Sequence, residues 1–324
     1  MSLANKYRPK DWDDVIEQRY AIQILQNHLA NQKFNSVYLF LAPAGVGKTT
    51  LARLFATKIN GVPDSYVEID AASYNSAESM RTLVENASTT SIGYEYKIFI
   101  IDEVHALSTQ AFQVLLKIFE EAPKKTIFML CTTEYKKVPE TIKSRSLILK
   151  LARITNRGLL DRLKYICNKE GYDIKEEILV YISNVARGGL RSGISKLEQI
   201  VSAGVNDLES ARKILDLGIS EETLYKVITN LNNPEAVIRL VEDEIYGQCF
   251  GPEDFKQSLQ QYVTDILKYY YTNEIRFTNL SSVDYLSGNI DTRQLRRLLK
   301  KLTFMSVVNK EVMDGLFILF NEEE

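Results

Sequence analysis

The sequence predicts an α/β protein in which a parallel sheet covered by helices is followed by helices alone. Short apolar runs alternate with helix-periodic segments as far as residue 152, as in chains that join parallel strands through helices. A glycine-rich turn follows the first strong apolar run and opens a helix. After residue 152 the helical periodicity continues without strand-like runs, so we expect a sheet domain at 1–152 and helical domains at 153–219 and 220–324.

The predicted elements follow in a regular order. An extended arm comes first, and then a helix whose apolar stripe consists of Ile22, Ile24, Leu25 and Leu29. Strands are predicted at Val37–Leu41, Tyr66–Ile69, Lys97–Ile101, Ile127–Leu130 and Ile148–Leu151. Helices are predicted at Lys48–Ile59, at Ser76–Ala87, and where Leu107, Ala111, Leu115 and Ile118 share one face before Pro123.

Composition limits the classes of function. The three cysteines lie far apart and there are only two histidines, so we expect reduced cytosolic thiols and no histidine-rich metal site. No apolar run approaches the roughly 18 residues that span a membrane, and the first residues lack the apolar stretch of a signal peptide. Because the formal net charge is −2, any nucleic-acid site must be a local patch.

The residues Ala-Pro-Ala-Gly-Val-Gly-Lys-Thr at 42–49 lie between a predicted strand and a helix, which is the arrangement of a Walker A phosphate loop. Glycines let the backbone turn several amide groups toward one anion. Lys48 can reach the β- and γ-phosphates, and Thr49 can bind Mg²⁺. The expected nucleotide-binding residues here are Pro43, Ala44, Gly45, Val46, Gly47, Lys48, Thr49 and Thr50. Ala42 replaces the usual glycine, and a turn that binds nothing is the alternative.

Two acidic residues end the apolar strand at 97–101. Parallel strands present their carboxyl ends at one crevice, so Asp102 is expected to hold Mg²⁺ and Glu103 to accept the proton of an attacking water. The alternative is an acidic first turn that favours the dipole of the next helix. The following strand ends in two threonines, of which Thr133 is the first choice and Thr132 the second for a contact with the γ-phosphate or the water.

Several further motifs agree with these in order and spacing. They are Lys6–Pro9, Asp14–Ile16, Glu68–Ser73, Ile101–Ser108, Leu115–Lys117, Glu120–Pro123, Thr132–Thr133 and Ser144–Ser146. In these motifs the chain resembles AAA+ clamp-loader ATPases, above all the bacterial tau/gamma subunit of DNA polymerase III, with replication factor C subunits as more distant relatives. The resemblance covers about residues 4–200 and is weak from 220 onward.

The resemblance implies a P-loop AAA+ domain, a helical lid and a helical collar, with ATP and Mg²⁺ as ligands. It implies that Arg145 is an arginine finger that reaches the ATP of a neighbouring subunit, and that Arg191 contacts the subunit's own γ-phosphate. A surface salt bridge is the alternative for either arginine. The residues implied to border the adenine are Tyr7, Arg8, Pro9, Val15 and Ile16.

The resemblance also implies partners: a sliding clamp, primer–template DNA, and related subunits in an assembly of about five. DNA would be held by its phosphates, with Arg81 as the best single candidate and Ser76, Ser108 and Thr109 as possible hydroxyl or amide contacts. Helix N-capping alone is the alternative for these hydroxyl residues. We expect a cytoplasmic protein, of a bacterial cell or of an infected host cell if a bacteriophage encodes it.

The chain departs from the bacterial subunit, and two alternative functions fit the same motifs. The interval 60–66 is too short for the four-cysteine zinc module of the bacterial subunit, and the long polymerase-binding tail is absent, so we expect no zinc and a minimal loader subunit. One rival is a ring-forming DNA motor of the branch-migration helicase type, although residues 220–324 show no strand-rich wing. The other is a loader subunit that binds nucleotide without hydrolysing it.

Overall fold

The computed structural model describes residues 2–80, 82, 93–121, 125–215, 219, 221–242, 251–273, 291–305 and 310–322. The chain divides into two compact units, Met1–Gly204 and Val205–Glu324. The division into three domains with boundaries near 152 and 219 stays a prediction.

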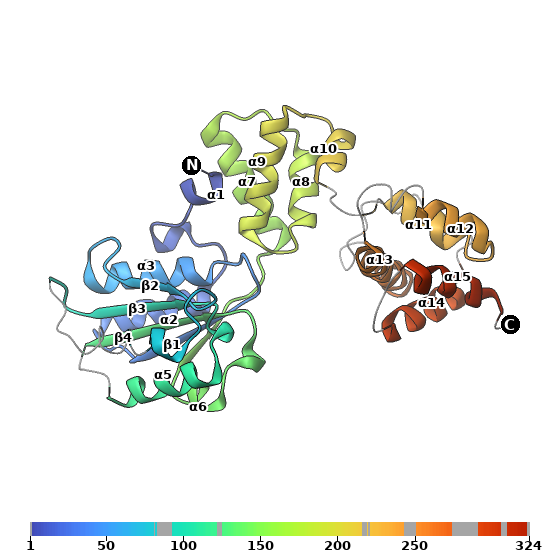
Figure 1. The fold of residues 1–324 in the computed structure, drawn as a ribbon. Coiled ribbons are helices and arrows are strands. Elements are labelled where there is room, and N and C mark those ends of the chain that lie inside the picture. The colour runs from blue at the N-terminus through green and yellow to red at the C-terminus, as the bar shows by residue number, and fades with distance from the viewer. Residues whose placement is uncertain are drawn as a thin grey trace. The chain divides into compact units, whose positions relative to one another are not determined.

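The first unit is built on a five-stranded sheet in which all pairings are parallel. The strand order is β2-β3-β4-β1-β5, and Figure 1 shows the sheet with β1 to β4 labelled. The strands are β1 (Val37–Leu41), β2 (Val67–Asp70), β3 (Lys97–Asp102), β4 (Thr126–Thr132) and β5 (Leu147–Lys150). The predicted fold class is therefore confirmed, and each strand lies within a residue or two of its predicted range.

Helices cover both faces of the sheet. Successive strand residues point to opposite faces, so Tyr38 and Phe40 pack against α2 (Arg19–Ala30) and α3 (Lys48–Asn60). Leu39 packs on the other face, together with the helices α5 (Thr109–Glu121) and α6 (Glu140–Lys143). The predicted apolar residues Leu107, Ala111, Leu115 and Ile118 are all buried, although Leu107 precedes the first residue of α5.

Two expectations for the first thirty residues are wrong. Ile24 is 37% exposed, because Ala21 and Leu25, one turn apart, form the buried side of α2 instead. The arm is not fully extended, since it contains α1 (Leu3–Lys6) and the 3₁₀ turn η1 (Trp12–Asp14). The buried side chain of Leu3 and the packing of α1 against α9 explain why this short helix forms.

Three helices follow the sheet within the first unit. They are α7 (Asn156–Glu170), α8 (Glu176–Val185) and α9 (Leu190–Ala203), and each packs against the other two. The arm is attached to α7, because Lys6 and Tyr7 both donate hydrogen bonds to the carboxylate of Glu170. The arm and this three-helix bundle are thus held together by side-chain contacts.

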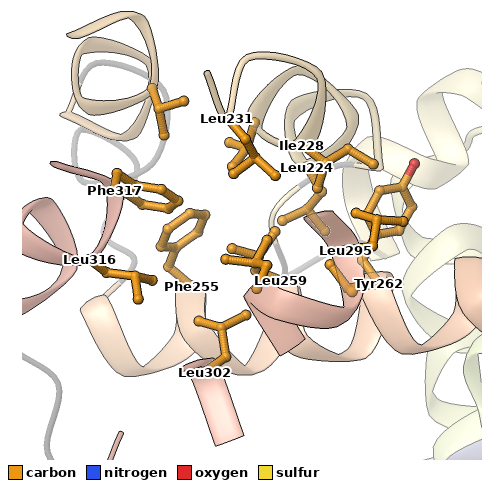
Figure 2. Packing of buried hydrophobic residues seen from close by; sticks show 14 of the residues in the cluster. Leu224, Ile228, Leu231, Phe255, Leu259, Tyr262, Leu295, Leu302, Leu316 and Phe317 are labelled. Carbon is orange, nitrogen blue, oxygen red and sulfur yellow. The ribbon is translucent and has the colours of Figure 1, made fainter. Parts of the chain in front are cut away.

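Every secondary-structure element that the structure describes in the second unit is a helix. Its helices are α10 (Leu208–Leu215), α11 (Glu221–Thr229), α12 (Pro234–Leu240), α13 (Pro252–Thr272), α14 (Thr292–Phe304) and α15 (Lys310–Glu322). Figure 2 shows side chains of α11, α13, α14 and α15 in one apolar core, where the rings of Phe255 and Phe317 lie 6.2 Å apart. Among the described helices none is long and apolar enough to cross a membrane.

Candidate nucleotide-binding site

The site forms where three neighbouring strands end. Strands β3, β4 and β1 are adjacent and parallel, so the residues that follow them lie along one edge of the sheet. Those residues are the phosphate loop after β1, Asp102 and Glu103 at the end of β3, and Thr132 and Thr133 at the end of β4. The topology alone therefore brings together motifs that are about fifty and thirty residues apart in the sequence.

The phosphate loop has the backbone shape that its glycines predict. Gly45 and Gly47 have φ values of +73° and +116°, a region that side chains other than glycine rarely adopt. Gly47 is the N-cap of α3, so the amino-terminal end of that 13-residue helix faces the loop. The backbone amide of Arg191 donates to the carbonyl of Gly45 over 3.3 Å, which places the start of α9 against the loop.

Lys48 is buried, with only 6% of its surface exposed. Its ammonium donates to the carbonyl oxygen of Ala42 at 3.2 Å and to that of Pro43 at 3.5 Å. The carboxylate of Glu103 lies 4.0 Å away. A buried ammonium is costly unless an anion pairs with it, and the phosphates of a nucleoside triphosphate would supply that anion.

Thr49 and Asp102 form a pair of oxygen ligands. The hydroxyl of Thr49 donates to Asp102 Oδ2 at 2.7 Å, and the other carboxylate oxygen accepts the backbone N–H of Glu103 at 3.0 Å. A hydroxyl and a carboxylate are oxygen ligands of the kind that Mg²⁺ prefers, so this pair fits the predicted metal. Within the described part of the chain no three His, Cys, Asp or Glu side chains gather into a metal-binding group.

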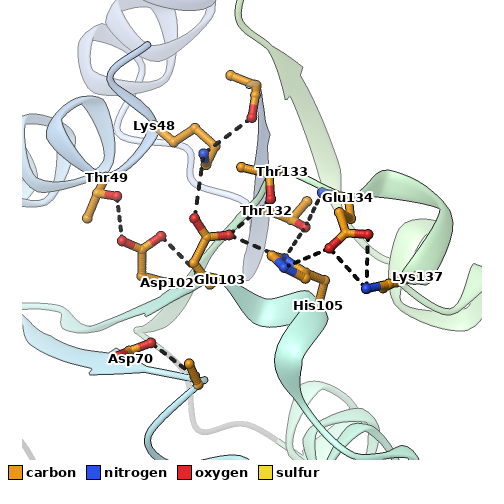
Figure 3. Close-up of polar contacts among 12 residues, drawn as sticks. Lys48, Thr49, Asp70, Asp102, Glu103, His105, Thr132, Thr133, Glu134 and Lys137 are labelled. Atoms are coloured by element: carbon orange, nitrogen blue, oxygen red, sulfur yellow. Dashed lines mark hydrogen bonds and ion pairs between the residues drawn. The ribbon is translucent and has the colours of Figure 1, made fainter. Parts of the chain in front are cut away.

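Glu103 contacts three side chains of the site, as Figure 3 shows. Besides Lys48, the Thr133 hydroxyl donates to Glu103 Oε2 at 3.3 Å, and His105 Nδ1 lies 3.2 Å from the same oxygen. Thr132 is fully buried, and its hydroxyl accepts the backbone N–H of Glu134. Which threonine would meet the γ-phosphate stays a prediction, although Thr133 is the one that contacts Glu103.

Neither His105 nor Glu134 was predicted from the sequence to belong to the site. His105 belongs to the Asp-Glu-Val-His stretch that follows β3, and its other ring nitrogen lies 3.2 Å from Glu134 Oε1. The signal available in the sequence was a polar residue two positions after Glu103. That signal was weak, because a single histidine after a strand is more often a structural residue than part of a site.

The residues expected at the adenine separate into several groups. Ile16 packs with Leu190 against an apolar cluster of Ile154, Leu159 and Ala186, close to the loop-bound start of α9. A cavity of about 400 Å³ lies beside Ile16 and the first turns of α7. Val15 instead packs into the core on the α2–α3 face of the sheet.

The side chains of Tyr7 and Arg8 contact residues outside the phosphate loop. Burial, and next the hydrogen bond to Glu170, raise the pKa of the Tyr7 hydroxyl to about 12. Arg8 donates to the side chain of Asn5, and Pro9 is half-buried. Ile16 thus packs beside Leu190 at the start of α9, and the adenine contacts of Tyr7, Arg8, Pro9, Val15 and Ile16 stay predictions.

Arg145 is on the surface of the first unit. Its guanidinium is 43% exposed, pairs with Glu120 at 2.7 Å and donates to the carbonyl of Thr141. An exposed ion pair of this kind contributes only about 0–1 kcal/mol, so the arginine can change partners easily.

The residues expected to hold DNA are partly described. The hydroxyl of Ser76 accepts the backbone N–H of Ser79, and the hydroxyl of Ser108 accepts that of Ala111, as helix caps do. Thr109 is exposed at the first position of α5, and Arg81 lies outside the described residues. Capping and phosphate contact are compatible, so DNA binding by these residues stays a prediction.

Cys131, at the end of β4 beside the site, gives a chemical test of this packing. Its side chain is fully buried, and burial raises the pKa of the thiol well above its usual value. Since the thiolate is the reactive form, Cys131 is expected to resist maleimide in the folded chain at pH 8 and to react within minutes in denaturant. Peptide mapping of the labelled cysteines measures this, and rapid labelling of native Cys131 would contradict the buried strand end.

Comparison with known proteins gives the family. The tau subunit of DNA polymerase III from Bacillus subtilis is 32% identical over 291 residues, which is 83% of this chain and 52% of the relative. The gamma subunit from Buchnera aphidicola subsp. Baizongia pistaciae is 34% identical over 71% of this chain and 68% of the relative. The chain belongs to the family of DNA polymerase III gamma and tau subunits. The chain spans about half of the length of the Bacillus subtilis relative.

Two further comparisons agree with the fold. Residues 62–155 of the chain match the family model described as DNA polymerase III, delta subunit. The branch migration motor RuvB of Thermotoga maritima superposes with a TM-score of 0.55 at 17% identity, over 78% of this chain and 91% of RuvB. A mutant of that motor gives 0.57 at 18% identity. At these identities the likeness concerns the fold alone.

Proposed function

We propose that the chain is an ATPase subunit of a DNA sliding-clamp loader. The observation that carries the proposal is the single cluster formed by Lys48, Thr49, Asp102, Glu103 and Thr133 at the carboxyl edge of the sheet. The family supports the same reading, because the relatives are named as subunits of a DNA polymerase. ATP binding would open and load the clamp on primer–template DNA, and hydrolysis would release it.

The residues of the cluster divide the work of phosphoryl transfer. The loop amides and Lys48 bind and neutralise the phosphate oxygens, and Thr49 and Asp102 would hold Mg²⁺, which supplies further charge neutralisation when bound. Glu103 accepts a proton as water attacks the γ-phosphorus and the bond to the β–γ bridging oxygen breaks. Thr133 holds the carboxylate of Glu103 in place.

The assembly is the second part of the proposal. The side chain of Arg145 is exposed on the surface of its own subunit, as is required of an arginine that acts on the ATP of a neighbour. Arg191, whose backbone already contacts the loop, would meet the γ-phosphate of its own subunit. We propose related subunits, in an assembly of about five, with a sliding clamp and primer–template DNA as partners.

Replacing Lys48 with alanine is expected to weaken ATP binding by a factor on the order of 100, because the buried cation that meets the β- and γ-phosphates is lost. Fluorescence titration with a labelled ATP analogue measures the dissociation constant. Lys58→Ala is the matched control, since Lys58 is on the same helix but pairs with Asp11 at 3.1 Å. Equal affinity of the Lys48→Ala and wild-type chains would refute the assigned phosphate site.

The function as a whole is tested by adding partners. Phosphate release is measured for the full chain with candidate clamps, with the other subunits of the loader and with primed DNA. The proposal predicts that primed DNA and clamp together raise the hydrolysis rate several-fold. Phosphate release that no clamp and no DNA changes would point to a different ATPase, and closed six-fold rings in electron micrographs would favour the branch-migration motor.

A further inference from the structure

His105 lies between two carboxylates that belong to different parts of the first unit. Its Nδ1 is 3.2 Å from Glu103 Oε2, and its Nε2 is 3.2 Å from Glu134 Oε1. The ring is mostly buried, with 16% of the side chain exposed, and the hydroxyl of Thr132 lies 3.1 Å from Nδ1. The ring thus has fixed neighbours on both nitrogens (Figure 3).

Glu103 stands at a strained turn, and its side chain is partly exposed. Its φ of +47° lies in the left-handed region, at the turn between β3 and the 3₁₀ helix η2 (Val104–Ala106). Its carboxylate is 38% exposed, and the contact with Lys48 is long, at 4.0 Å. A proton acceptor must be held within a fraction of an ångström of its working position, so a second donor on Oε2 matters for the rate.

Glu134, the outer partner of His105, makes further contacts of its own. Glu134 pairs with Lys137 at 3.0 Å. Glu134 is the N-cap of the 3₁₀ helix η3 (Tyr135–Lys137), and Lys137 is its last residue. The chain then passes through α6 to Arg145. The contacts Glu103–His105–Glu134 therefore join the carboxylate of one ATP site to the segment whose arginine would serve the neighbouring site.

We propose that His105 is a positioning residue for Glu103, that it donates from Nδ1 to the carboxylate of Glu103, and that it donates from Nε2 to the carboxylate of Glu134, which fixes the ring from the opposite side. The carboxylate that accepts the proton is thereby tied to the Glu134–Arg145 segment. This inference rests on the proposed ATPase function and adds a residue to it that the phosphate-loop motifs do not contain.

Four variants separate the two sides of the ring. An asparagine amide can occupy the place of Nδ1, and a glutamine amide the place of Nε2, so His105→Asn keeps the Glu103 contact and His105→Gln keeps the Glu134 contact. His105→Ala removes both contacts, and Glu134→Ala leaves the ring in place without its outer partner. His28→Asn is the matched control. The side chain of His28 contacts the Tyr38 hydroxyl, at 2.7 Å, and neither Glu103 nor Glu134.

The rate of hydrolysis and the affinity for ATP are measured separately on the full chain with its loader partners. The proposal predicts that His105→Ala and His105→Gln lower kcat by about ten-fold, that His105→Asn and Glu134→Ala lower it by about two- to three-fold, and that the dissociation constant of ATP changes less than about three-fold in all of them. A kcat unchanged in His105→Ala would overturn the proposal. So would equal losses in the alanine, asparagine and glutamine variants accompanied by a lower melting temperature, because that pattern indicates a purely structural role.

A spectroscopic measurement tests the same contact without turnover. The chain has only two histidines, so ¹⁵N spectra of the histidine rings are simple, and the His28→Asn variant assigns them. The proposal predicts a protonated Nδ1 on His105 in the wild type, and loss of that Nδ1 proton in Glu103→Ala. An unprotonated Nδ1 in the wild type would overturn it. If the wild type bound ATP but never hydrolysed it, the proposed function would fail, and the ring spectrum would still decide the Glu103–His105 contact.

Discussion

Replacing Arg145 with alanine is expected to lower ATP hydrolysis by the assembled protein by a factor on the order of 10³, because an arginine finger offsets the charge of the transferring phosphoryl group. The affinity of each subunit for ATP should change little, since Arg145 does not contact the subunit's own phosphate loop and pairs with Glu120 instead. Steady-state phosphate release and ATP titration on the same preparation measure the two effects.

A mixing experiment shows whether Arg145 acts on a neighbour. Subunits with Arg145→Ala and subunits with Glu103→Gln are each expected to be inactive alone, whereas an equal mixture should recover about a quarter of the wild-type interfaces. Lys164→Ala is the control for loss of an exposed ion pair, because Lys164 pairs with Glu176 at 2.6 Å on α7 and α8. No recovery in the mixture would show that Arg145 does not act in trans.

Replacing Glu103 with glutamine is expected to lower kcat by a factor of about 10²–10⁴ while ATP binding is retained. The amide keeps the size of the side chain and its contacts with Thr133 and His105, but it cannot accept the proton of the attacking water. Single-turnover hydrolysis of radiolabelled ATP measures the loss. Equal rates for the variant and the wild type would mean that another group activates the water.

The best-predicted part of the molecule is the one whose chemistry restricts the residue type. Gly45, Gly47 and Lys48 are recognisable because a phosphate loop requires glycine backbone angles and a cation at fixed spacing. Asp102 and Glu103 were predictable because adjacent acids rarely end a buried strand. The parallel order of β3, β4 and β1 then places them together, and that order follows from the alternation of strands and helices.

Contacts that depend on tertiary packing were not predictable. His105 is a single residue without a spacing rule, and its two carboxylate neighbours come from segments about thirty residues apart. The pairing of Arg145 with Glu120 joins the end of α5 to the residues after α6, and nothing in either motif indicates it. The arm was predicted as extended because α1 has only four residues, and its helix depends on packing against α9.

The hydrogen bond from the Arg191 amide to the carbonyl of Gly45 connects the phosphate loop to helix α9. Helix α9 has 14 residues, so it extends about 21 Å from that bond. It packs against α7, α8 and α1, so direct contacts join the loop, the bundle and the arm. A shift of the phosphate loop on phosphate binding would therefore be transmitted through α9 to the bundle and the arm.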